Sequence, residues 1–312
     1  MIINFYRQIR IDTGRLNFEV GCLYLKIDMS YISPFDPWRS PFCSCPPKYS
    51  LNPYTGCGHM CLYCYASSFI KDFYSPRPKK EFLKKIEKEL PKLPPESLIS
   101  LSNSSDPYQP LEKIHKSTRM FLDLIKGLPL KVLIITKSNL VLRDIDLLKK
   151  LRVAVAITIT TKVYQVRLEP GAPSFEERLL ALKVLSQEGI PTIVRIDPII
   201  PEINEEEVLE VLTEVLPFVK HVVVSTYKAN PRSLKRLIKA FPEKAKILTD
   251  LYLQKGERKK GGIYLPEEIR KSLIEKIYNK VNQIKEVSFA TCREGLVEFS
   301  FQGRCDGSFL LN

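Results

Sequence analysis

The chain has 312 residues, 44% of them hydrophobic, and a formal net charge of +13 at pH 7. That length suffices for one large domain with a substantial core, and the charge favours polyanionic partners. No uninterrupted apolar run approaches a transmembrane span, and charges break up the N-terminal apolar residues too early for a signal peptide. We therefore expect a soluble, cytoplasmic protein without a membrane partner, whose eight cysteines serve metal or redox chemistry rather than disulfides.

Residues 1–45 are predicted to form an irregular N-terminal arm. The arm ends in the proline-rich sequence SPFDPWRSPFCSCPP, which contains Cys43 and Cys45. A regular alternation of elements begins only after this sequence, so the arm is expected to lie outside the main fold.

The central part of the chain, residues 46–227, alternates short β-branched runs with amphipathic helical stretches. This alternation predicts βα units, a parallel sheet and right-handed crossovers. The runs are almost entirely apolar, as expected for strands that are covered on both faces. The predicted strands are 97–102, 131–137, 153–160, 191–197 and 221–226, and the predicted helices are 79–90, 115–126, 141–149, 174–187 and 205–218.

The sequence YSLNPYTG, residues 49–56, supplies one further strand before these. About six βα units result, which is fewer than the eight of a closed barrel. We therefore predict an α/β fold with a partial, open (β/α)6 TIM-type barrel of parallel strands. The pattern alone also permits a doubly wound sheet.

Residues 228–312 are predicted to form a basic C-terminal extension. Between Lys228 and Lys260 there are eleven Lys or Arg residues and three acids, so this stretch carries +8 of the net charge. Two interpretations fit equally well: a solvated helix face, or a patch that follows the phosphates of a nucleic acid. A glycine turn in KKGGIYLP, a helix from Pro266 to about Gln283 and a final hairpin are expected to complete the chain.

Cys57, Cys61 and Cys64 lie close together in the sequence NPYTGCGHMCLYCYA. This segment is predicted to begin as a glycine-flanked loop and to enter a helix near Leu62. Structural zinc usually takes four ligands as two separated pairs, whereas three close thiols suit an iron–sulfur cubane with one iron left open. The alternatives are a chance grouping and a zinc loop that recruits His59, which is otherwise expected to support the ligands through a hydrogen bond.

The triplet, with Tyr63 directly before its last cysteine, resembles the signature of the radical S-adenosylmethionine superfamily. Its flanking residues resemble the branch of that superfamily related to spore photoproduct lyase. The resemblance covers residues 48–225 and includes further blocks in the same order: SDPYQPLE (105–112), TKSNLVLRD (136–144), LEPGAPSFEERLLALKVLSQEGI (168–190) and DPIIP (197–201).

This resemblance implies a 4Fe–4S cluster held by Cys57, Cys61 and Cys64. Its open iron would bind the amino and carboxylate groups of S-adenosylmethionine. One electron, from a donor of the ferredoxin or flavodoxin type, would then release methionine and a 5′-deoxyadenosyl radical that takes a hydrogen atom from the substrate. The protein aims the radical and excludes water, at the C-terminal ends of the barrel strands.

The same resemblance indicates residues that bind S-adenosylmethionine. Lys137, at the end of a predicted strand, is placed to bind the methionine carboxylate; the alternative is an ordinary lysine at a strand end. Thr158 and Thr160 either offer hydroxyls to the cofactor or serve only in packing. Arg195 either points into the barrel or forms a buried salt bridge.

A second set of candidates lies nearer to the cysteines. Ser104, Ser105 and Asp106 follow the second strand, where many members of the family bind the amino group of the cofactor. The same residues fit a helix cap, and both interpretations stay open. Tyr63 and Tyr65 are expected to line the adenine pocket.

One position departs from spore photoproduct lyase itself, which uses a cysteine to return a hydrogen atom to the product radical. The corresponding residue is Asn103, and no cysteine occurs between Cys64 and Cys292. An amide cannot replace a weak S–H bond as hydrogen donor. We therefore expect a substrate other than the thymine spore lesion.

Four further cysteines lie outside the central region: Cys43, Cys45, Cys292 and Cys305. Together they offer four thiolates, enough for a second iron–sulfur cluster or a structural zinc that ties the N-terminal arm to the C-terminal extension. The alternative is a set of packed or unrelated free thiols. Cys22, flanked by apolar residues, is expected to serve in packing.

Three functions are compatible with these observations. The first is a radical S-adenosylmethionine enzyme that modifies a nucleic-acid base, which must be flipped out of any duplex to reach the radical. The second is the same chemistry on a protein or a small molecule, with the positive charge a surface feature only. The third is a zinc-stabilised RNA-binding module without enzymatic activity.

Overall fold

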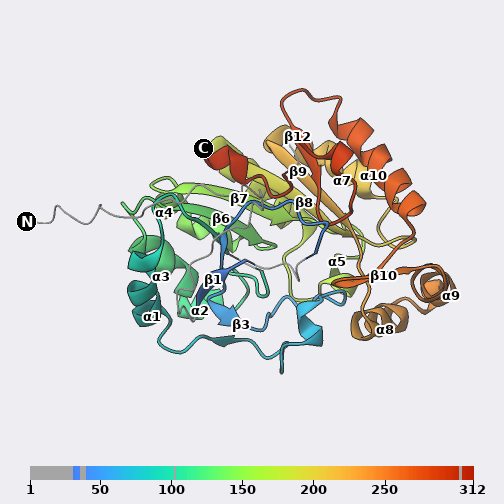
Figure 1. Ribbon diagram of the computed structural model, residues 1–312, viewed down its shortest axis with the longest axis horizontal. Coiled ribbons are helices and arrows are strands. Elements are labelled where there is room, and N and C mark those ends of the chain that lie inside the picture. The colour runs from blue at the N-terminus through green and yellow to red at the C-terminus, as the bar shows by residue number, and fades with distance from the viewer. Residues whose placement is uncertain (1–30, 36–39, 102, 302–303) are drawn as a thin grey trace, which may run out of the picture.

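The computed structural model describes residues 31–35, 40–101, 103–301 and 304–312, and Cys22 lies outside them. Its main feature is an eight-stranded sheet with helices on its outer side (Figure 1). In spatial order the strands are β1 (Ile32–Pro34), β2 (Tyr49–Leu51), β5 (Leu98–Leu101), β6 (Lys131–Thr136), β7 (Arg152–Thr158), β8 (Thr192–Ile199), β9 (His221–Thr226) and β12 (Ser288–Thr291).

The strands from β2 to β12 run parallel to one another, whereas β1 pairs with β2 in the antiparallel orientation. The prediction that residues 1–45 lie outside the main fold was therefore wrong for β1, which joins the sheet by pairing with β2. β1 and β12 are the two edges of the sheet, and no pairing among the described residues joins them. The predicted open, partial TIM-type barrel is therefore confirmed. A separate two-stranded ribbon, β3 (Tyr54–Thr55) with β4 (Arg77–Pro78), lies beside it.

The C-terminal extension contributes a strand to the main sheet, so the prediction of a final hairpin was wrong. β12 pairs in parallel with β9, from Ser288 opposite His221 to Thr291 opposite Val224. Because β12 follows the long helix α10 (Glu267–Val281), the extension adds one more unit with a helical crossover. The hairpin lies earlier, where β10 (Glu257–Lys259) and β11 (Gly262–Tyr264) pair across the glycine turn.

Helices cover the outer face of the sheet, and their apolar side chains form the main core. Val155 and Val194 lie in this core with Leu182 and Leu212 from two of the covering helices. Full burial of such a side chain stabilises the fold by about 1.5–3 kcal/mol. Besides α10, the helices are α1 (Phe82–Glu89), α2 (Glu112–His115), α3 (Ser117–Leu124), α4 (Ile145–Leu148), α5 (Gln165–Leu168), α6 (Phe175–Gln187), α7 (Val208–Val215), α8 (Pro231–Ala240) and α9 (Ala245–Thr249).

Two predicted helices differ from the observed ones. The stretch 141–149 divides into a 3-10 turn, Asn139–Asp144, and the short α4. The cysteine loop does not enter a helix near Leu62, because the Leu62 amide donates to the carbonyl of Leu168 at 2.9 Å and the loop is shaped by distant segments. Only a 3-10 turn, Ala66–Ser68, follows the last cysteine of the triplet.

The inner face of the sheet holds a smaller core near the start of the strands. Ala154 and Ala156 of β7 face this core, and their small side chains leave room for Leu311 from the C-terminal segment. Since successive side chains alternate along a strand, Thr158 and Arg195 share the inner face further along β7 and β8. The inner space near the C-terminal strand ends is therefore lined by polar side chains.

The residues after β9 pack on the barrel through a further core. Leu234 and Leu237 of α8 lie in it together with Leu168 and Ile200 from the barrel loops. α8 and α9 lie beside β10 at the lower right of Figure 1. Among the described helices, none combines the length and the apolar character that crossing a membrane requires.

Candidate functional site

A cavity of about 650 Å³ lies at the C-terminal ends of the strands, where barrel enzymes carry their active sites. All three cysteines of the triplet line it. Of the other predicted cofactor-binding residues, Thr160 is not part of the lining. The remaining ones all line the cavity: Tyr63, Tyr65, Ser104, Ser105, Asp106, Lys137, Thr158 and Arg195.

Gln109 fixes the loop around Cys57, although the sequence analysis did not single it out. Its side-chain oxygen accepts from the Gly58 amide at 2.8 Å, and its Nε2 donates to the Gly56 carbonyl at 3.0 Å. The Ser105 hydroxyl donates to the same carbonyl at 2.7 Å. The backbone groups on both sides of Cys57 are thus satisfied by buried side chains.

The block LEPG packs against the second half of the cysteine loop. The Gly171 amide donates to the His59 carbonyl at 3.1 Å, next to the bond between Leu62 and Leu168. A Cβ atom at Gly171 would lie 2.0 Å from the Gly58 carbonyl oxygen. Only glycine allows so close an approach of two backbones, which explains this residue of the block.

His59 and Asp106 connect the cysteine loop to the ends of the strands. His59 Nε2 lies 3.2 Å from Asp106 Oδ2, which also accepts from the Lys137 amide at 2.8 Å. Asp106 Oδ1 accepts from the Thr136 hydroxyl at 2.7 Å. Burial would raise the pKa of Asp106, but His59 and these hydrogen bonds hold it below its ordinary value. Because protein donors surround this carboxylate, the structure favours a positioning role for Asp106.

Lys137 and Tyr63 meet at Glu169, a fully buried carboxylate. Lys137 Nζ lies 3.4 Å from Glu169 Oε1, Arg178 Nη2 lies 2.5 Å from Oε2, and the Tyr63 hydroxyl donates to Oε1. Burial alone would raise the pKa of Glu169, but Arg178 and Lys137 hold it well below its ordinary value. The sequence analysis missed Glu169 and Arg178, although both lie in the block LEPGAPSFEER.

At the ends of β7 and β8, some of the predicted side chains line the cavity, whereas others bond only to protein groups. The Thr160 hydroxyl lies 3.0 Å from the Tyr63 hydroxyl and 3.3 Å from the Asp197 carbonyl, so its hydrogen bonds go to protein groups. Thr158 is buried and lines the cavity. Arg195 also lines it and pairs with Asp197 at 2.6 Å, so both interpretations of this arginine hold.

Two arginines of α8 hold the cysteine loop from the side of the C-terminal extension. Arg236 donates to the carbonyls of Leu62 at 2.9 Å and Cys64 at 3.2 Å. Arg232 donates to the carbonyl of Ser68 at 2.8 Å. Part of the positive charge in the stretch 228–260 therefore supports the triplet. No local sequence signal indicated this role.

Tyr65 and Asn103 form one wall of the cavity. The Tyr65 hydroxyl donates to the Asn103 carbonyl, and the Asn103 side-chain amide donates to the Ser50 hydroxyl at 2.7 Å. The amides of Asn103 and Ser104 both donate to the side-chain oxygen of Asn52. The position that resembles the cysteine of the lyase thus lies on the cavity wall and carries an amide.

The three thiols of the triplet fit an iron–sulfur cluster in their chemistry. Burial raises the pKa of Cys57 to about 12 and raises the pKa values of Cys61 and Cys64 as well. Such thiols ionise only beside a strong cation, which metal ligation supplies.

The second cysteine group lies at the same cavity. Cys45, Cys292 and Cys305 line it, and Cys43 lies two positions before Cys45 in the same segment. The sulfur atoms of Cys45 and Cys305 are 3.3 Å apart, although the residues are 260 positions apart in the chain. The structure thus brings together all four of these predicted residues.

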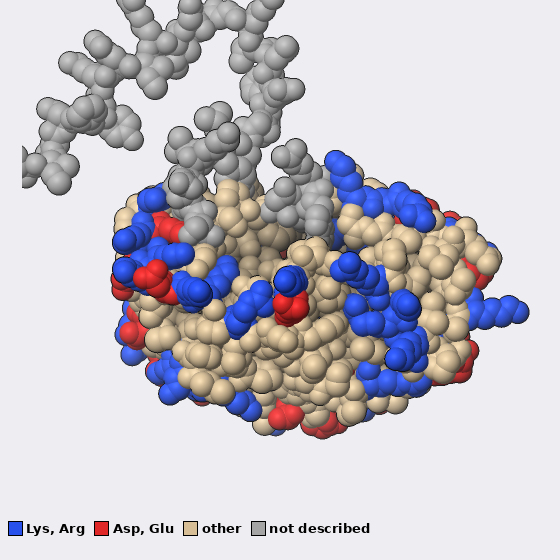
Figure 2. All heavy atoms as spheres, turned by 90° about the horizontal axis from the view of Figure 1, so that it is seen from below, with Lys and Arg blue, Asp and Glu red and all other residues tan. Residues whose placement is uncertain are grey.

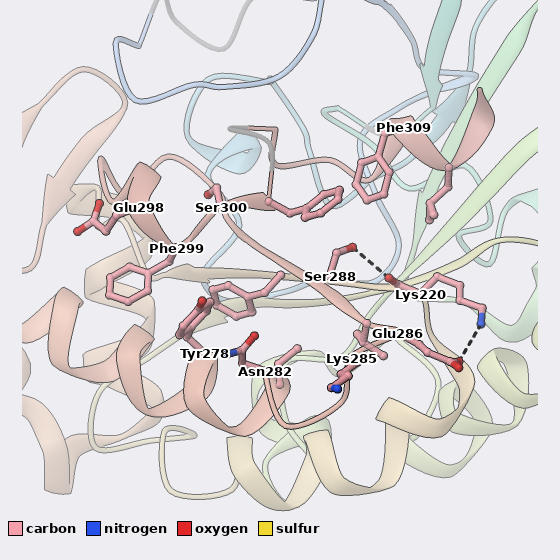
Figure 3. A pocket seen from close by; sticks show the side chains of 15 residues that line it. Lys220, Tyr278, Asn282, Lys285, Glu286, Ser288, Glu298, Phe299, Ser300 and Phe309 are labelled. Atoms are coloured by element: carbon pink, nitrogen blue, oxygen red, sulfur yellow. Dashed lines mark hydrogen bonds and ion pairs between the residues drawn. The ribbon is translucent and has the colours of Figure 1, made fainter.

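A second hollow, of about 440 Å³, lies at the opposite end of the strands. Lys220, directly before β9, and Ser288, the first residue of β12, line it together with the rings of Phe299 and Phe309 (Figure 3). In barrels of this kind the N-terminal face serves stability. We therefore place the functional site at the cavity that contains the cysteines.

Comparisons with known proteins agree with this placement. Residues 51–215 match the Radical SAM superfamily. An uncharacterized protein of Methanocaldococcus jannaschii is 34% identical over 227 residues, which cover 70% of this chain and 84% of that protein. The Radical SAM Nalpha-GlyT isomerase of Pseudomonas phage M6 is 25% identical over 78% of this chain and 53% of its own length.

Among solved structures, spore photoproduct lyase complexed with dinucleoside spore photoproduct has a similar fold. Its TM-score is 0.65 at 17% identity, and the match covers 86% of this chain and 81% of that one. At this identity the likeness concerns the fold alone. The zinc-stabilised module without activity is no longer supported, because the matched family and the named relative are enzymes of one class. The chain belongs to the radical SAM superfamily and is an enzyme of the radical SAM class.

Proposed function

We propose that this enzyme binds a 4Fe–4S cluster through Cys57, Cys61 and Cys64 and acts on a nucleic-acid base. The observation that carries the proposal is the composition of the cavity. It is lined by three thiols of a single loop and by a lysine from the end of β6. The cluster and S-adenosylmethionine, when bound, supply the electron transfer and the radical chemistry. The chain itself binds, orients and shields these groups.

Lys137 is proposed to bind the carboxylate of S-adenosylmethionine. Its ammonium group lies 5.5 Å from the centre of the Tyr63 ring and 3.4 Å from Glu169. Glu169 is shared between Lys137 and Arg178, so two cations face one protein carboxylate. One positive charge therefore remains to attract the carboxylate of the cofactor.

Other polar groups of the cavity wall are proposed to orient the rest of the cofactor. Tyr65 and Ser104 line the cavity and are assigned to the adenine and the amino group. Ser105 and Asp106 instead hold the cysteine loop and the strand ends, because their side chains bond to protein. Thr158 is assigned as a hydroxyl donor from β7.

The nucleic-acid part of the proposal is supported by the basic stretch 228–260. Lys228 and Gly261, at its two ends, line the cavity. Figure 2 shows two groups of Lys and Arg side chains on one face: one on the left, mixed with acidic residues, and one on the right, on the side where Figure 1 places α8 and α9. Six exposed cations of this stretch have no carboxylate partner among the described residues: Arg232, Lys235, Lys239, Lys246, Arg258 and Lys260.

The similar fold of spore photoproduct lyase supports the same substrate class. That enzyme was solved with a dinucleoside, which is a fragment of nucleic acid. In the present chain the cavity wall carries Asn103 where a hydrogen-donating cysteine would be needed for lesion repair. The proposed reaction is therefore modification of a base that is flipped out or single-stranded, rather than repair of the thymine lesion.

The cofactor chemistry is tested by anaerobic reconstitution with iron and sulfide, followed by S-adenosylmethionine and dithionite. The unchanged protein is expected to form 5′-deoxyadenosine, and a ferredoxin or flavodoxin, the donor class that we propose, should replace dithionite. Cys61→Ala should reduce the product to background, because the cluster loses one of its three ligands. Cys22→Ala is the matched control, since Cys22 belongs to neither cysteine group. Equal product from Cys61→Ala would overturn the assignment.

The substrate class is tested by comparing two variants that carry the same number of charge reversals on different helices. Lys235→Glu/Lys239→Glu changes α8, and Lys271→Glu/Lys276→Glu makes the same change in net charge on α10. Binding of tRNA and single-stranded DNA is measured over a range of salt concentrations. The α8 variant should lower the salt slope by about two, whereas the α10 variant should leave it unchanged. Equal effects would show attraction by net charge alone and favour a protein or small-molecule substrate.

A further inference from the structure

Four cysteines from the two ends of the described chain meet at one side of the cavity. The sulfur atoms of Cys45 and Cys305 lie 3.3 Å apart, Cys292 lines the same cavity, and Cys43 is two positions from Cys45. All four are free thiols, and a separation of 3.3 Å exceeds the disulfide bond length of about 2.0 Å. Three of the four thiols therefore line one cavity, and the fourth belongs to the same short segment as one of them.

These thiols come from segments at the two opposite edges of the open sheet. Cys43 and Cys45 lie in the connection between β1 and β2, at one edge. Cys292 directly follows β12 at the other edge, where its amide donates to the Val224 carbonyl at 2.8 Å. Cys305 lies in the C-terminal segment, and its carbonyl is 3.4 Å from His221 Nε2.

Contacts other than those between sulfur atoms hold the same segments together. Lys48 Nζ lies 2.6 Å from Asp306 Oδ2, and both side chains are buried. The ring of Phe42 packs edge-on against that of Tyr264, with 6.0 Å between the centroids. The meeting of the four thiols therefore follows from the packing of the chain, and does not depend on a sulfur contact alone.

We propose that Cys43, Cys45, Cys292 and Cys305 bind one structural metal ion, zinc, which closes the open side of the barrel. Tetrahedral zinc with Zn–S bonds near 2.3 Å places neighbouring sulfur atoms about 3.8 Å apart. The separation of 3.3 Å between the sulfur atoms of Cys45 and Cys305 is close to this spacing, whereas a cubane would hold its four thiolates further apart. The bound ion would draw the side chains of Cys43 and Cys292 toward this pair by side-chain rotation.

Two cations stand beside the proposed site. Lys48 Nζ lies 3.4 Å from the sulfur of Cys45, and Arg195 lines the same cavity as Cys292. Four thiolates around Zn²⁺ carry a net charge of −2, so adjacent positive donors stabilise the bound form. This gives Arg195 a supporting role at the second metal rather than at S-adenosylmethionine. With four protein ligands the site is closed, which is typical of structural zinc.

The test is a metal analysis of the full-length protein purified without air. About one zinc per chain is expected, and the triple variant Cys57→Ala/Cys61→Ala/Cys64→Ala should retain it while losing iron. Cys45→Ser/Cys305→Ser should lose the zinc and retain iron at the triplet, and Cys22→Ser is the matched control. This readout does not depend on turnover, so failure of the proposed enzymatic function leaves it intact.

A second measurement covers the case in which Cys45→Ser/Cys305→Ser does not fold. Cobalt is exchanged into the triple variant, and the spectrum is expected to show intense thiolate charge transfer with tetrahedral ligand-field bands. A chelator should then lower the thermal midpoint of the same protein. Iron and sulfide at the second group, a disulfide between Cys45 and Cys305 in anaerobic mass analysis, or no metal at all would each overturn the proposal.

Discussion

The two cysteine groups line one cavity but are assembled in opposite ways. The triplet lies in a single loop. Hydrogen bonds to the backbone of this loop hold it from three sides, and they come from Gln109, the segment 168–171 and α8. The second group draws its thiols from opposite ends of the chain, and Cys45 and Cys305 are 260 positions apart. Its geometry depends on how the two edges of the sheet come together.

Under the two proposals above, this difference separates the group that carries out chemistry, the triplet, from the group that closes the barrel. An iron with an open coordination position is reactive, whereas a metal with four protein ligands only stabilises the fold. Damage around the triplet loop is therefore expected to remove iron while the chain stays folded. Damage around the second group is expected to weaken the fold while folded molecules keep iron at the triplet.

The largest expected effect on stability tests the second half of this comparison. Lys48 and Asp306 form an ion pair at 2.6 Å, and each side chain is only 2% exposed. Lys48→Met leaves the charge of Asp306 buried without its partner, which costs about 3–5 kcal/mol. Urea unfolding should show this loss in the free energy of unfolding. Iron bound per folded chain should not change.

A double variant controls for the buried charge. Lys48→Met/Asp306→Asn leaves no uncompensated carboxylate, so it should recover part of the lost stability, and the two single variants complete a double-mutant cycle. A loss below about 1 kcal/mol in Lys48→Met would mean that this pair behaves like an exposed one. An accompanying loss of iron would remove the separation between the two groups.

The parts of the molecule that depend on local pattern could be predicted from the sequence. β6 (Lys131–Thr136) and β9 (His221–Thr226) coincide with predicted strands, because both are apolar runs bounded by polar residues. The triplet could be recognised for the same reason, since its three thiols lie in one short loop. Thr158 and Arg195 were candidates from the family resemblance, and the alternation of side chains along β7 and β8 explains why both line the cavity.

The parts that depend on distant contacts could not be predicted. β12 has only four residues, Ser288–Thr291, and becomes a strand by pairing with β9. Arg236 contacts Cys64 across 172 positions, so neither residue signals the other in the sequence. Glu169 and Arg178 looked like parts of a motif whose physical role becomes clear only where Glu169 meets both Arg178 and Lys137.

A smaller effect is expected at Arg236, which tests how the triplet loop is held. Arg236→Gln removes the charged donors to the carbonyls of Leu62 and Cys64. Loss of such a supporting contact usually lowers metal affinity about 10–100-fold, so iron should be lost more readily during anaerobic dialysis. The reduction potential of the bound cluster should fall, because a nearby positive charge favours the reduced form.

Two further arginine variants separate charge from geometry. Arg236→Lys keeps the charge but not the planar fork, so it should preserve the potential and lose part of the iron affinity. Arg232→Gln, on the same helix, removes only the bond to the Ser68 carbonyl and should change neither quantity. If Arg236→Gln matches Arg232→Gln, α8 holds the loop by packing alone.

The smallest expected effect is at Ser68, the last contact between the cysteine loop and α8. Its hydroxyl donates to the Asn230 side-chain oxygen at 2.7 Å, and that oxygen also accepts from the Ser233 amide at the start of α8. Ser68→Ala removes one neutral hydrogen bond, worth about 0.5–1.5 kcal/mol, and leaves the helix cap in place. Urea unfolding should show this small loss, with iron content unchanged.

Asn230→Ala provides the comparison for this last variant, because it removes the helix cap as well. A further loss of about 1 kcal/mol is expected from the cap. Asn230→Ala should leave the iron content unchanged, in contrast to Arg236→Gln, because of these two residues it is the arginine that donates to the backbone of Cys64. If Ser68→Ala instead released iron as readily as Arg236→Gln does, that result would mean that the cysteine loop depends on all of its contacts with α8. The triplet would then depend on the C-terminal extension as much as the second cysteine group does.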